Sequence, residues 1–154
     1  MMNKMIFEGI LEICDKHAQR LSLALTHLSE KSPFTPSIIL DLNDVDLAFC
    51  DQFLVRYSKL QDLMGAKLLP AILELTYEEG ELKSFIDKLN RLEKIGAISS
   101  VKEWLELREM RNQLAQDYPD DPNIQSSLLN KAYKNSNRIL EILTEIKCFA
   151  KKYY

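Results

Sequence analysis

The chain has 154 residues, of which 46% are hydrophobic and 28% are charged. This balance is ordinary for one globular domain with a sizeable core, so the sequence predicts a single domain over residues 1–154. The formal net charge of -3 argues against a broad basic surface that grips nucleic acid, although it leaves room for a small local basic site. With only 4 glycines and 5 prolines, the composition favours long helices over many short strands.

The cysteines and the hydropathy of the chain indicate the compartment in which the protein is found. Cys14, Cys50 and Cys148 are far apart and match no metal-binding or redox spacing, which predicts buried, reduced thiols in a cytoplasmic protein. The first residues carry Glu8 and no long apolar core, so we do not expect a signal peptide. No run approaches the roughly 20 apolar residues of a membrane span, so no membrane contact is expected.

Near the N-terminus, apolar residues recur every three or four positions and so share one face of a helix. This pattern predicts a helix over about residues 4–29. A loop is expected over residues 30–43, because Pro33 and Pro36 interrupt any helical pattern there. The short apolar run at residues 38–40 is interpreted as a brief turn packed on the remaining helices.

The second long pattern predicts a helix over about residues 44–76, with Asp44 as its N-cap. Pro70 lies inside this pattern and lacks the backbone donor that a helix needs. We therefore expect a kink near the proline, with Gly65 adding local freedom.

Two shorter patterns follow. The first predicts a helix over about residues 79–94, and Gly96 suits a left-handed C-terminal cap. Ser100 and Glu103 have the spacing of a capping box, which predicts a fourth helix from there to about residue 117.

Asp121 and Pro122 are a typical cap and first residue for the last helix. From Leu129 to Tyr153, the positions expected to face inward recur alternately every three and every four residues. This spacing is typical of the seam between helices that pack nearly antiparallel. Short loops between amphipathic helices imply antiparallel neighbours. The predicted fold is all-α, an up-and-down antiparallel helical bundle of four long helices and one short helix.

The stretch from Arg111 to Tyr118 is the most informative for function. Both residues fall on an apolar stripe with Trp104, Leu107 and Leu114. An arginine on a stripe that seeks burial is costly unless a partner or a ligand meets it. This makes the stretch a candidate site, with an arginine–glutamate pair inside the bundle as the alternative interpretation.

Other polar residues extend this candidate site. Asn112 and Gln116 are four residues apart and could bond to each other, and Arg108 continues their row. Arg56, in the predicted second helix, flanks the apolar stripe. It either extends past that stripe to solvent or points into the same polar pocket as Arg111.

The usual catalytic and metal-binding patterns are absent from the sequence. His17 and His27 lie about 80° and about 15 Å apart on one helix, so they cannot share a metal ion. A hydrogen-bonded, packed His17 is favoured over a catalytic one. No glycine-rich phosphate loop and no nucleophile elbow occurs, and the aspartates of residues 41–51 are better explained as caps and solvated acids. We expect neither a cofactor nor a bound metal.

Residues 111–118 resemble the Arg-x4-His-x-Tyr motif of the HEPN superfamily, in its HepT-like branch, with Arg111 and Tyr118 at the first and last positions. Residues 51–62, followed by Met64-Gly65, are similar to the second helix of one HepT-like subgroup, and residues 87–95 and 103–112 are similar to later segments. The likeness covers about residues 44–154. The combination of these segments is much more specific than the eight-residue motif.

The resemblance implies a helical homodimer with its motif at a cleft between protomers, paired with an MNT-type nucleotidyltransferase in a toxin–antitoxin-type module. In such modules the HEPN protein is the toxin and is regarded as a metal-independent ribonuclease. The partner can neutralise it by transferring AMP to the motif tyrosine, here Tyr118. Related bundles are substrate-binding subunits of two-component nucleotidyltransferases. On this pattern Arg111 would bind a phosphate of RNA or a nucleotide, with Asn112 as an orienting group and Arg56 as a second cationic wall.

The chain departs from the motif at the family histidine, which is Gln116 here. Glutamine forms hydrogen bonds but cannot titrate near neutral pH, and acid–base catalysis typically contributes about 10²–10⁴-fold. We therefore expect weak or absent ribonuclease activity from Arg111, Gln116 and Tyr118, and a protein that acts through binding. An active ribonuclease toxin and a bundle without any ligand are the alternatives.

Overall fold

The computed structural model describes residues 2–78, 80 and 82–154. Every element within these ranges is a helix, which confirms the all-α prediction. The elements are α1 (Lys4–Leu28), α2 (Pro36–Asp41), α3 (Asp44–Leu63), the π-helical turn η1 (Met64–Leu68), α4 (Leu69–Leu75), α5 (Phe85–Lys94), α6 (Val101–Leu114), α7 (Pro122–Ala150) and the 3-10 turn η2 (Lys151–Tyr153).

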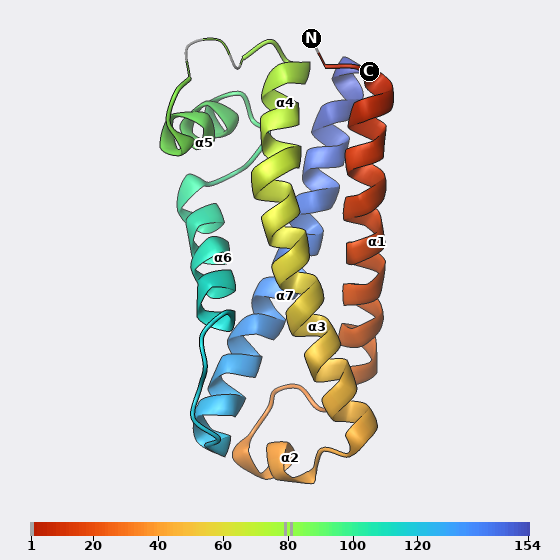
Figure 1. Ribbon diagram of the computed structural model, residues 1–154, viewed down its shortest axis with the longest axis vertical. Coiled ribbons are helices and arrows are strands. Elements are labelled where there is room, and N and C mark those ends of the chain that lie inside the picture. Colours follow the sequence, from red (N-terminus) through yellow and green to blue (C-terminus); the bar gives the residue numbers. More distant parts are fainter. Residues whose placement is uncertain (1, 79, 81) are drawn as a thin grey trace.

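Three long segments lie side by side in Figure 1: α1, the run from α3 through η1 to α4, and α7. Helix α1 packs along α3, and α7 contacts both of them. Helix α6 packs against α3 and α7, whereas α5 contacts α4 and α6, and α2 closes one end against α7. The core between these helices includes the buried side chains of Phe53, Tyr57 and Trp104.

Helix α7 begins where the sequence predicted. The Asp121 carboxylate accepts a hydrogen bond from the amide of Asn123 at 2.8 Å, and Pro122 takes the first helical position. The seven seam positions from Leu129 to Ala150 are all buried. Tyr153 is exposed because it lies in η2, beyond the end of α7.

The cap of α3 corrects one prediction, because Asn43 and not Asp44 is the N-cap. The Asn43 side chain accepts from the amide of Asp46 at 2.8 Å, and the Asp46 carboxylate accepts from the amide of Asn43 at 3.4 Å. This reciprocal arrangement needs an acceptor side chain three residues after the cap. Asn43 has one there, whereas three residues after Asp44 stands Leu47.

The expected irregularity near Pro70 takes the form of the π-helical turn η1, which ends two residues before the proline. The proline ring excludes the carbonyl of Ala66 from its normal helical place, and a π-helical turn accommodates that missing bond. The indole of Trp104 packs at this turn, since a Cβ added at Gly65 would lie 3.5 Å from its Cζ2 atom.

Helix α5 begins at Phe85 with Ser84 as its cap, later than the sequence predicted. The predicted start at Glu79 lies outside the described residues. Gly96 follows the helix with φ of 86°, the left-handed conformation that a C-terminal cap requires, as predicted.

Helix α6 begins after Ser100 as predicted, with the Ser100 hydroxyl accepting from the amide of Glu103 at 3.1 Å. Only this half of the expected capping box forms, because the Glu103 carboxylate bonds to Arg138 instead. The helix ends at Leu114, three residues before the predicted end.

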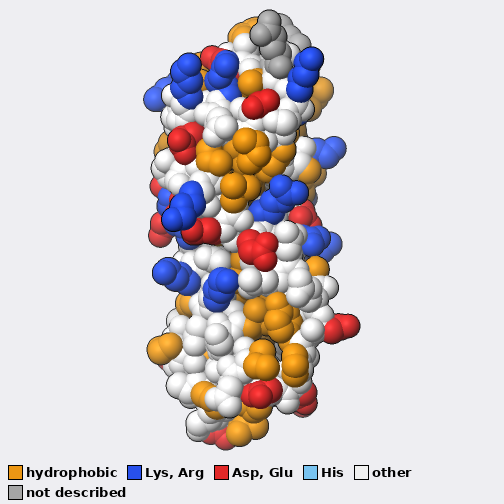
Figure 2. All heavy atoms as spheres, turned by 90° about the vertical axis from the view of Figure 1, so that its left-hand side faces the viewer, with side chains coloured by type: hydrophobic (Ala, Val, Ile, Leu, Met, Phe, Trp, Pro, Cys, Tyr) orange, Lys and Arg blue, Asp and Glu red, His pale blue; other side chains and the backbone are white. Residues whose placement is uncertain are grey.

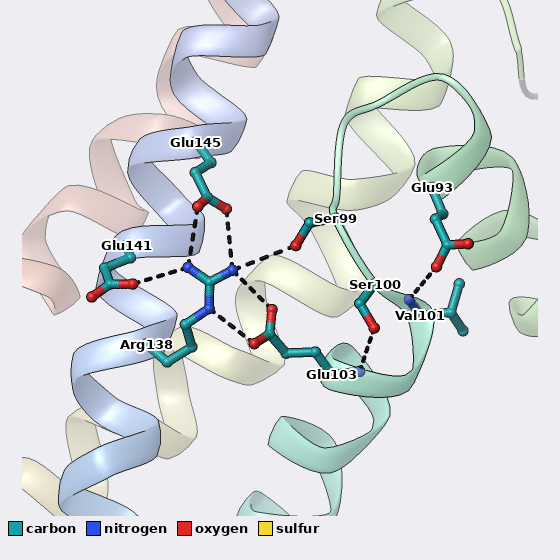
Figure 3. Close-up of polar contacts among 8 residues, drawn as sticks. All are labelled: Glu93, Ser99, Ser100, Val101, Glu103, Arg138, Glu141 and Glu145. Carbon is teal, nitrogen blue, oxygen red and sulfur yellow. Dashed lines mark hydrogen bonds and ion pairs between the residues drawn. The ribbon is translucent and has the colours of Figure 1, made fainter.

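Arg138 on α7 joins this helix to α6 through Glu103, and it also bonds to Glu141 and Glu145 of its own helix (Figure 3). Its guanidinium donates to Glu103 at 2.9 and 3.0 Å, to Glu141 at 3.0 Å and to Glu145 at 3.1 Å. The hydrogen bond from Arg138 lowers the pKa of Glu103, against the opposing effect of burial. The Arg138–Glu103 pair therefore stabilises the α6–α7 contact mainly while Glu103 is ionised.

We expect Arg138→Gln to lower the free energy of unfolding by about 1 kcal/mol at pH 7, because partly exposed ion pairs contribute up to about that amount. The pKa of Glu103 is lower in the folded chain, so its contribution is complete above its ordinary value of 4.5 and fades as the pH falls below it. Urea unfolding at pH 7 and pH 3 measures the difference. Lys4→Gln, which removes the exposed Lys4–Glu8 pair, is the control and should change little.

The cysteine prediction is right for two residues and wrong for one. Cys14 and Cys50 are buried, and burial raises the pKa of their thiols to about 12 and about 11. Cys148 is exposed, because it falls between the inward positions Ile146 and Phe149 on α7. Within the described part of the chain, none of the helices combines the length and apolarity needed to cross a membrane.

Candidate functional site

Arg111 leaves the last turn of α6 toward α3, where Asp62 binds it through both carboxylate oxygens. The Nε–Oδ1 distance is 2.8 Å and the Nη2–Oδ2 distance is 3.0 Å. The Arg111 side chain is 33% exposed and that of Asp62 is 51% exposed. The arginine is thus paired with an acid at the protein surface and is not buried unpaired in the core.

The apolar stripe that was expected to run from Trp104 to Tyr118 is buried only in its first part. Trp104 and Leu107 are buried, Arg111 and Leu114 are half-buried, and Tyr118 is exposed. The reason is that α6 ends at Leu114, so Tyr118 no longer follows the helical spacing. Arg111 is therefore the last polar residue of the stripe whose side chain is oriented by α6.

Arg111 lines a surface hollow of about 320 Å³ between α3 and α6. The hollow has an apolar wall and a polar wall, and its lining is Leu54, Val55, Ser58, Lys59, Asp62, Arg111, Leu114 and Ala115. Lys59 adds a second cation beside the Arg111–Asp62 pair. This hollow therefore offers positive charge beside an apolar surface, a combination suited to a small anionic group.

Gln116 and Tyr118 lie in a different hollow, of about 600 Å³, between the end of α6 and the start of α7. The residues that line it are Glu109, Gln113, Gln116, Tyr118, Asn123, Ile124, Ser127, Leu128 and Lys131. The backbone turns after Leu114, with the amide of Gln116 bonded to the carbonyl of Gln113 at 3.1 Å. One protomer thus separates Arg111 from the two later motif residues.

The other residues of the predicted polar row do not assemble. Asn112 is exposed and forms no hydrogen bond with Gln116, because the helix on which they would be neighbours ends between them. The guanidinium of Arg108 lies over the ring of Phe85 at 5.0 Å, which directs it toward α5. Asn112 consequently has no oriented role within one protomer.

Arg56 is not among the residues that line the hollow of Arg111. Its Nη1 atom lies 3.1 Å from Nδ1 of His17, across the contact between α3 and α1. Six helical steps separate Arg56 from Asp62, which rotates their side chains about 120° apart on α3. The structure therefore places Arg56 away from Arg111 and does not form the second cationic wall that the sequence suggested.

Asp62 and Tyr57 fall in the segment 51–62 that the sequence singled out, but no role at the site was predicted for either of them. Asp62 fixes the guanidinium of Arg111, and the two are 49 positions apart, so no local spacing links them. The hydroxyl of buried Tyr57 donates a hydrogen bond to the carbonyl of Leu107 at 2.7 Å and so joins α3 to α6. This bond lies about one turn before Asp62 on α3 and one turn before Arg111 on α6. Burial also raises the pKa of Tyr57, so the phenol stays protonated.

The surface around α5 and α6 has no dominant charge. Figure 2 shows this side with Lys and Arg side chains intermixed with Asp and Glu, and with hydrophobic side chains gathered in separate patches. Such a surface does not provide a broad grip on a nucleic-acid backbone. On this side, the positive charge that an anion could meet comes from individual side chains such as Arg111.

Comparisons of this chain with family models, with curated proteins and with solved structures find no match. The likeness to HepT-like HEPN proteins consequently rests on the sequence segments within residues 44–154, and the function has to be argued from the site itself.

Proposed function

We propose that this chain is a HepT-like HEPN protein that acts by binding, as the homodimeric partner of an MNT-type nucleotidyltransferase in a toxin–antitoxin-type module. The observation that carries the proposal is the guanidinium of Arg111, which Asp62 holds by two bonds at the edge of a surface hollow. Arg111 also occupies the motif position at which HepT-like proteins carry their arginine.

Asp62 leaves Arg111 able to bind an anion. A guanidinium has five N–H donors, and two of them point at the carboxylate of Asp62. Because the remaining three lie toward the other edge of the planar group, an incoming phosphoryl oxygen can bind there without displacing Asp62. Lys59 supplies a further positive charge in the same hollow. The pair therefore acts as an oriented anion clamp.

The dimer and the HEPN-type up-and-down antiparallel bundle are part of the proposal. A single protomer divides Arg111 from Gln116 and Tyr118, which line separate hollows. A second copy that covers this surface would bring the two sets of motif residues to one shared cleft. Static light scattering at micromolar concentration measures the mass directly, and a monomer would remove the shared cleft.

Transfer of AMP to Tyr118 is the decisive test. The purified chain is mixed with an MNT-type nucleotidyltransferase, the partner that the proposal expects, together with ATP and Mg²⁺, and intact mass and peptide mapping locate any AMP. We expect modification of Tyr118 and none in Tyr118→Phe. Tyr154→Phe is the matched control, since Tyr154 is 41% exposed and Tyr118 is 37% exposed. Absence of both complex formation and AMP transfer would contradict the proposal.

A ribonuclease toxin is the second candidate, favoured by the presence of both Arg111 and Lys59 at one hollow. It requires RNA cleavage in the presence of a chelator, and loss of cleavage in Arg111→Ala. Cleavage at full strength by the natural chain would favour this candidate over a protein that acts only by binding, because Gln116 cannot exchange a proton near neutral pH.

A further inference from the structure

Basic side chains meet at the contact between α1 and α3, around His17. Nη1 of Arg56 lies 3.1 Å from Nδ1 of His17. Arg20 follows His17 by three residues on α1, and Lys59 follows Arg56 by three residues on α3. Side chains three residues apart share a helix face. The two faces therefore bring four basic side chains to one place, and of these only Lys59 also lines the hollow of Arg111 and Asp62.

Arg56 lacks the acidic partner that three of the other five arginines have. Arg91, Arg111 and Arg138 each lie within 3.0 Å of a carboxylate oxygen. Arg56 contacts a histidine nitrogen instead, and no bond to a carboxylate occurs within the described residues. Its Nε atom is buried without a hydrogen-bond partner. A partly buried guanidinium without a counter-charge is unfavourable, so a bound anion would stabilise Arg56.

The charges around His17 have one sign. Burial lowers the pKa of His17, and the positive charges of Arg56, Lys59 and Arg20 lower it further. No acid contributes to this shift. His17 is consequently neutral at pH 7, and since its Nδ1 accepts from Arg56, its proton lies on Nε2, on the far side of the ring from Arg56. The local field favours any anion that reaches this face.

We propose that Arg20, Arg56 and Lys59, beside His17, form a binding site for a phosphoryl group on the α1–α3 face. A phosphate accepts several hydrogen bonds at once and carries close to two negative charges near pH 7, which matches two guanidinium groups and an ammonium better than a carboxylate does. The site shares Lys59 with the Arg111 hollow, whereas Arg20, Arg56 and His17 lie outside the lining of that hollow. It does not depend on the function proposed for the hollow.

The test is a titration of the full chain with inorganic phosphate at constant ionic strength, followed through the imidazole NMR signals. The chain has two histidines, and His27 serves as the internal reference because it bonds to Asp46 and stacks on Phe49. We expect a saturable shift of the His17 signal and none for His27. Arg56→Gln should weaken phosphate binding about tenfold or more, since bonds to charged groups are among the stronger ones.

Matched variants decide between this site and others. Arg91→Gln removes the same charge from α5 and should leave the phosphate titration unchanged. Arg111→Gln should also leave the His17 response unchanged. The proposal is overturned if His17 does not respond, if His27 responds equally, or if Arg111→Gln abolishes the effect while Arg56→Gln does not. Circular dichroism of each variant verifies that the fold is retained.

The phosphoryl group can belong to a free phosphate compound or to a nucleic-acid strand, and a second arm separates these sources. A single-stranded oligonucleotide without a terminal phosphate is titrated under the same conditions. Tighter, salt-dependent binding that Arg56→Gln weakens assigns the site to a phosphodiester backbone. A His17 response to phosphate with no response to the oligonucleotide assigns it to a free phosphoryl group. If neither probe moves the signal, the site does not exist.

Discussion

The Gln116→His substitution is expected to raise the rate of metal-independent RNA cleavage by about 10²–10⁴-fold, the usual contribution of a positioned acid–base group. Gln116 lines the same hollow as Tyr118, and it is exposed, so an imidazole can be accommodated there without disturbing the core. The new side chain would supply the proton transfer that an amide cannot. The rate is measured on a labelled RNA with excess chelator present.

The pH dependence and a second variant make this prediction specific. Cleavage by Gln116→His should change with pH around about 6.5, the ordinary pKa of histidine, whereas the natural chain should show no such step. Adding Arg111→Ala to Gln116→His should remove the gain, because the phosphate would lose its cationic contact. Equal rates for the natural chain and Gln116→His would show that this position takes no part in proton transfer.

The helix ends that could be predicted are those that a few adjacent residues specify by themselves. Asp121 followed by Pro122, and Gly96 after a periodic segment, specify backbone geometry within a few residues, and the structure has both features. The end of α6 was predicted too late because the turn at Pro119 and Pro122 shows where a helix cannot continue. It does not show which earlier residue is the last helical one.

The candidate site was less accessible to sequence because its contacts join distant positions. Asp62 and Arg111 are 49 residues apart, and Arg56 and His17 are 39 residues apart. Periodicity correctly placed His17, Arg56 and Arg111 on helices. It could not state which face meets which, and the alternative that Arg56 shares a pocket with Arg111 is wrong because α3 turns Arg56 away from Asp62, the partner of Arg111.

Trp104 is expected to be the most costly single side chain to remove near the site. Trp104→Ala should lower the free energy of unfolding by about 3–5 kcal/mol, as for other buried aromatic residues, which corresponds to a fall in Tm of about 10 °C. The side chain is 1% exposed and packs against the turn η1 at Gly65. Because Gly65 has no side chain that could fill the space, the cavity would remain largely open.

The measurement is thermal and urea unfolding followed by circular dichroism, since Trp104 is the only tryptophan and its loss removes the fluorescence signal. Trp104→Phe is the control. It keeps most of the packing and removes an indole N–H that is buried without a partner, so its cost should be well below that of Trp104→Ala. Equal costs for the two variants would contradict the assignment of the loss to the volume of the cavity.

The same residue connects stability to the site. Trp104 lies two turns before Arg111 on α6 and holds that helix against the run from α3 to α4 that carries Asp62. The distance between Arg111 and Asp62 is therefore set by how α6 rests on this indole. Trp104→Ala should weaken anion binding at Arg111 even below its melting temperature, whereas Trp104→Phe should retain it. A variant that lost stability but bound anions normally would show that Asp62 alone positions the guanidinium.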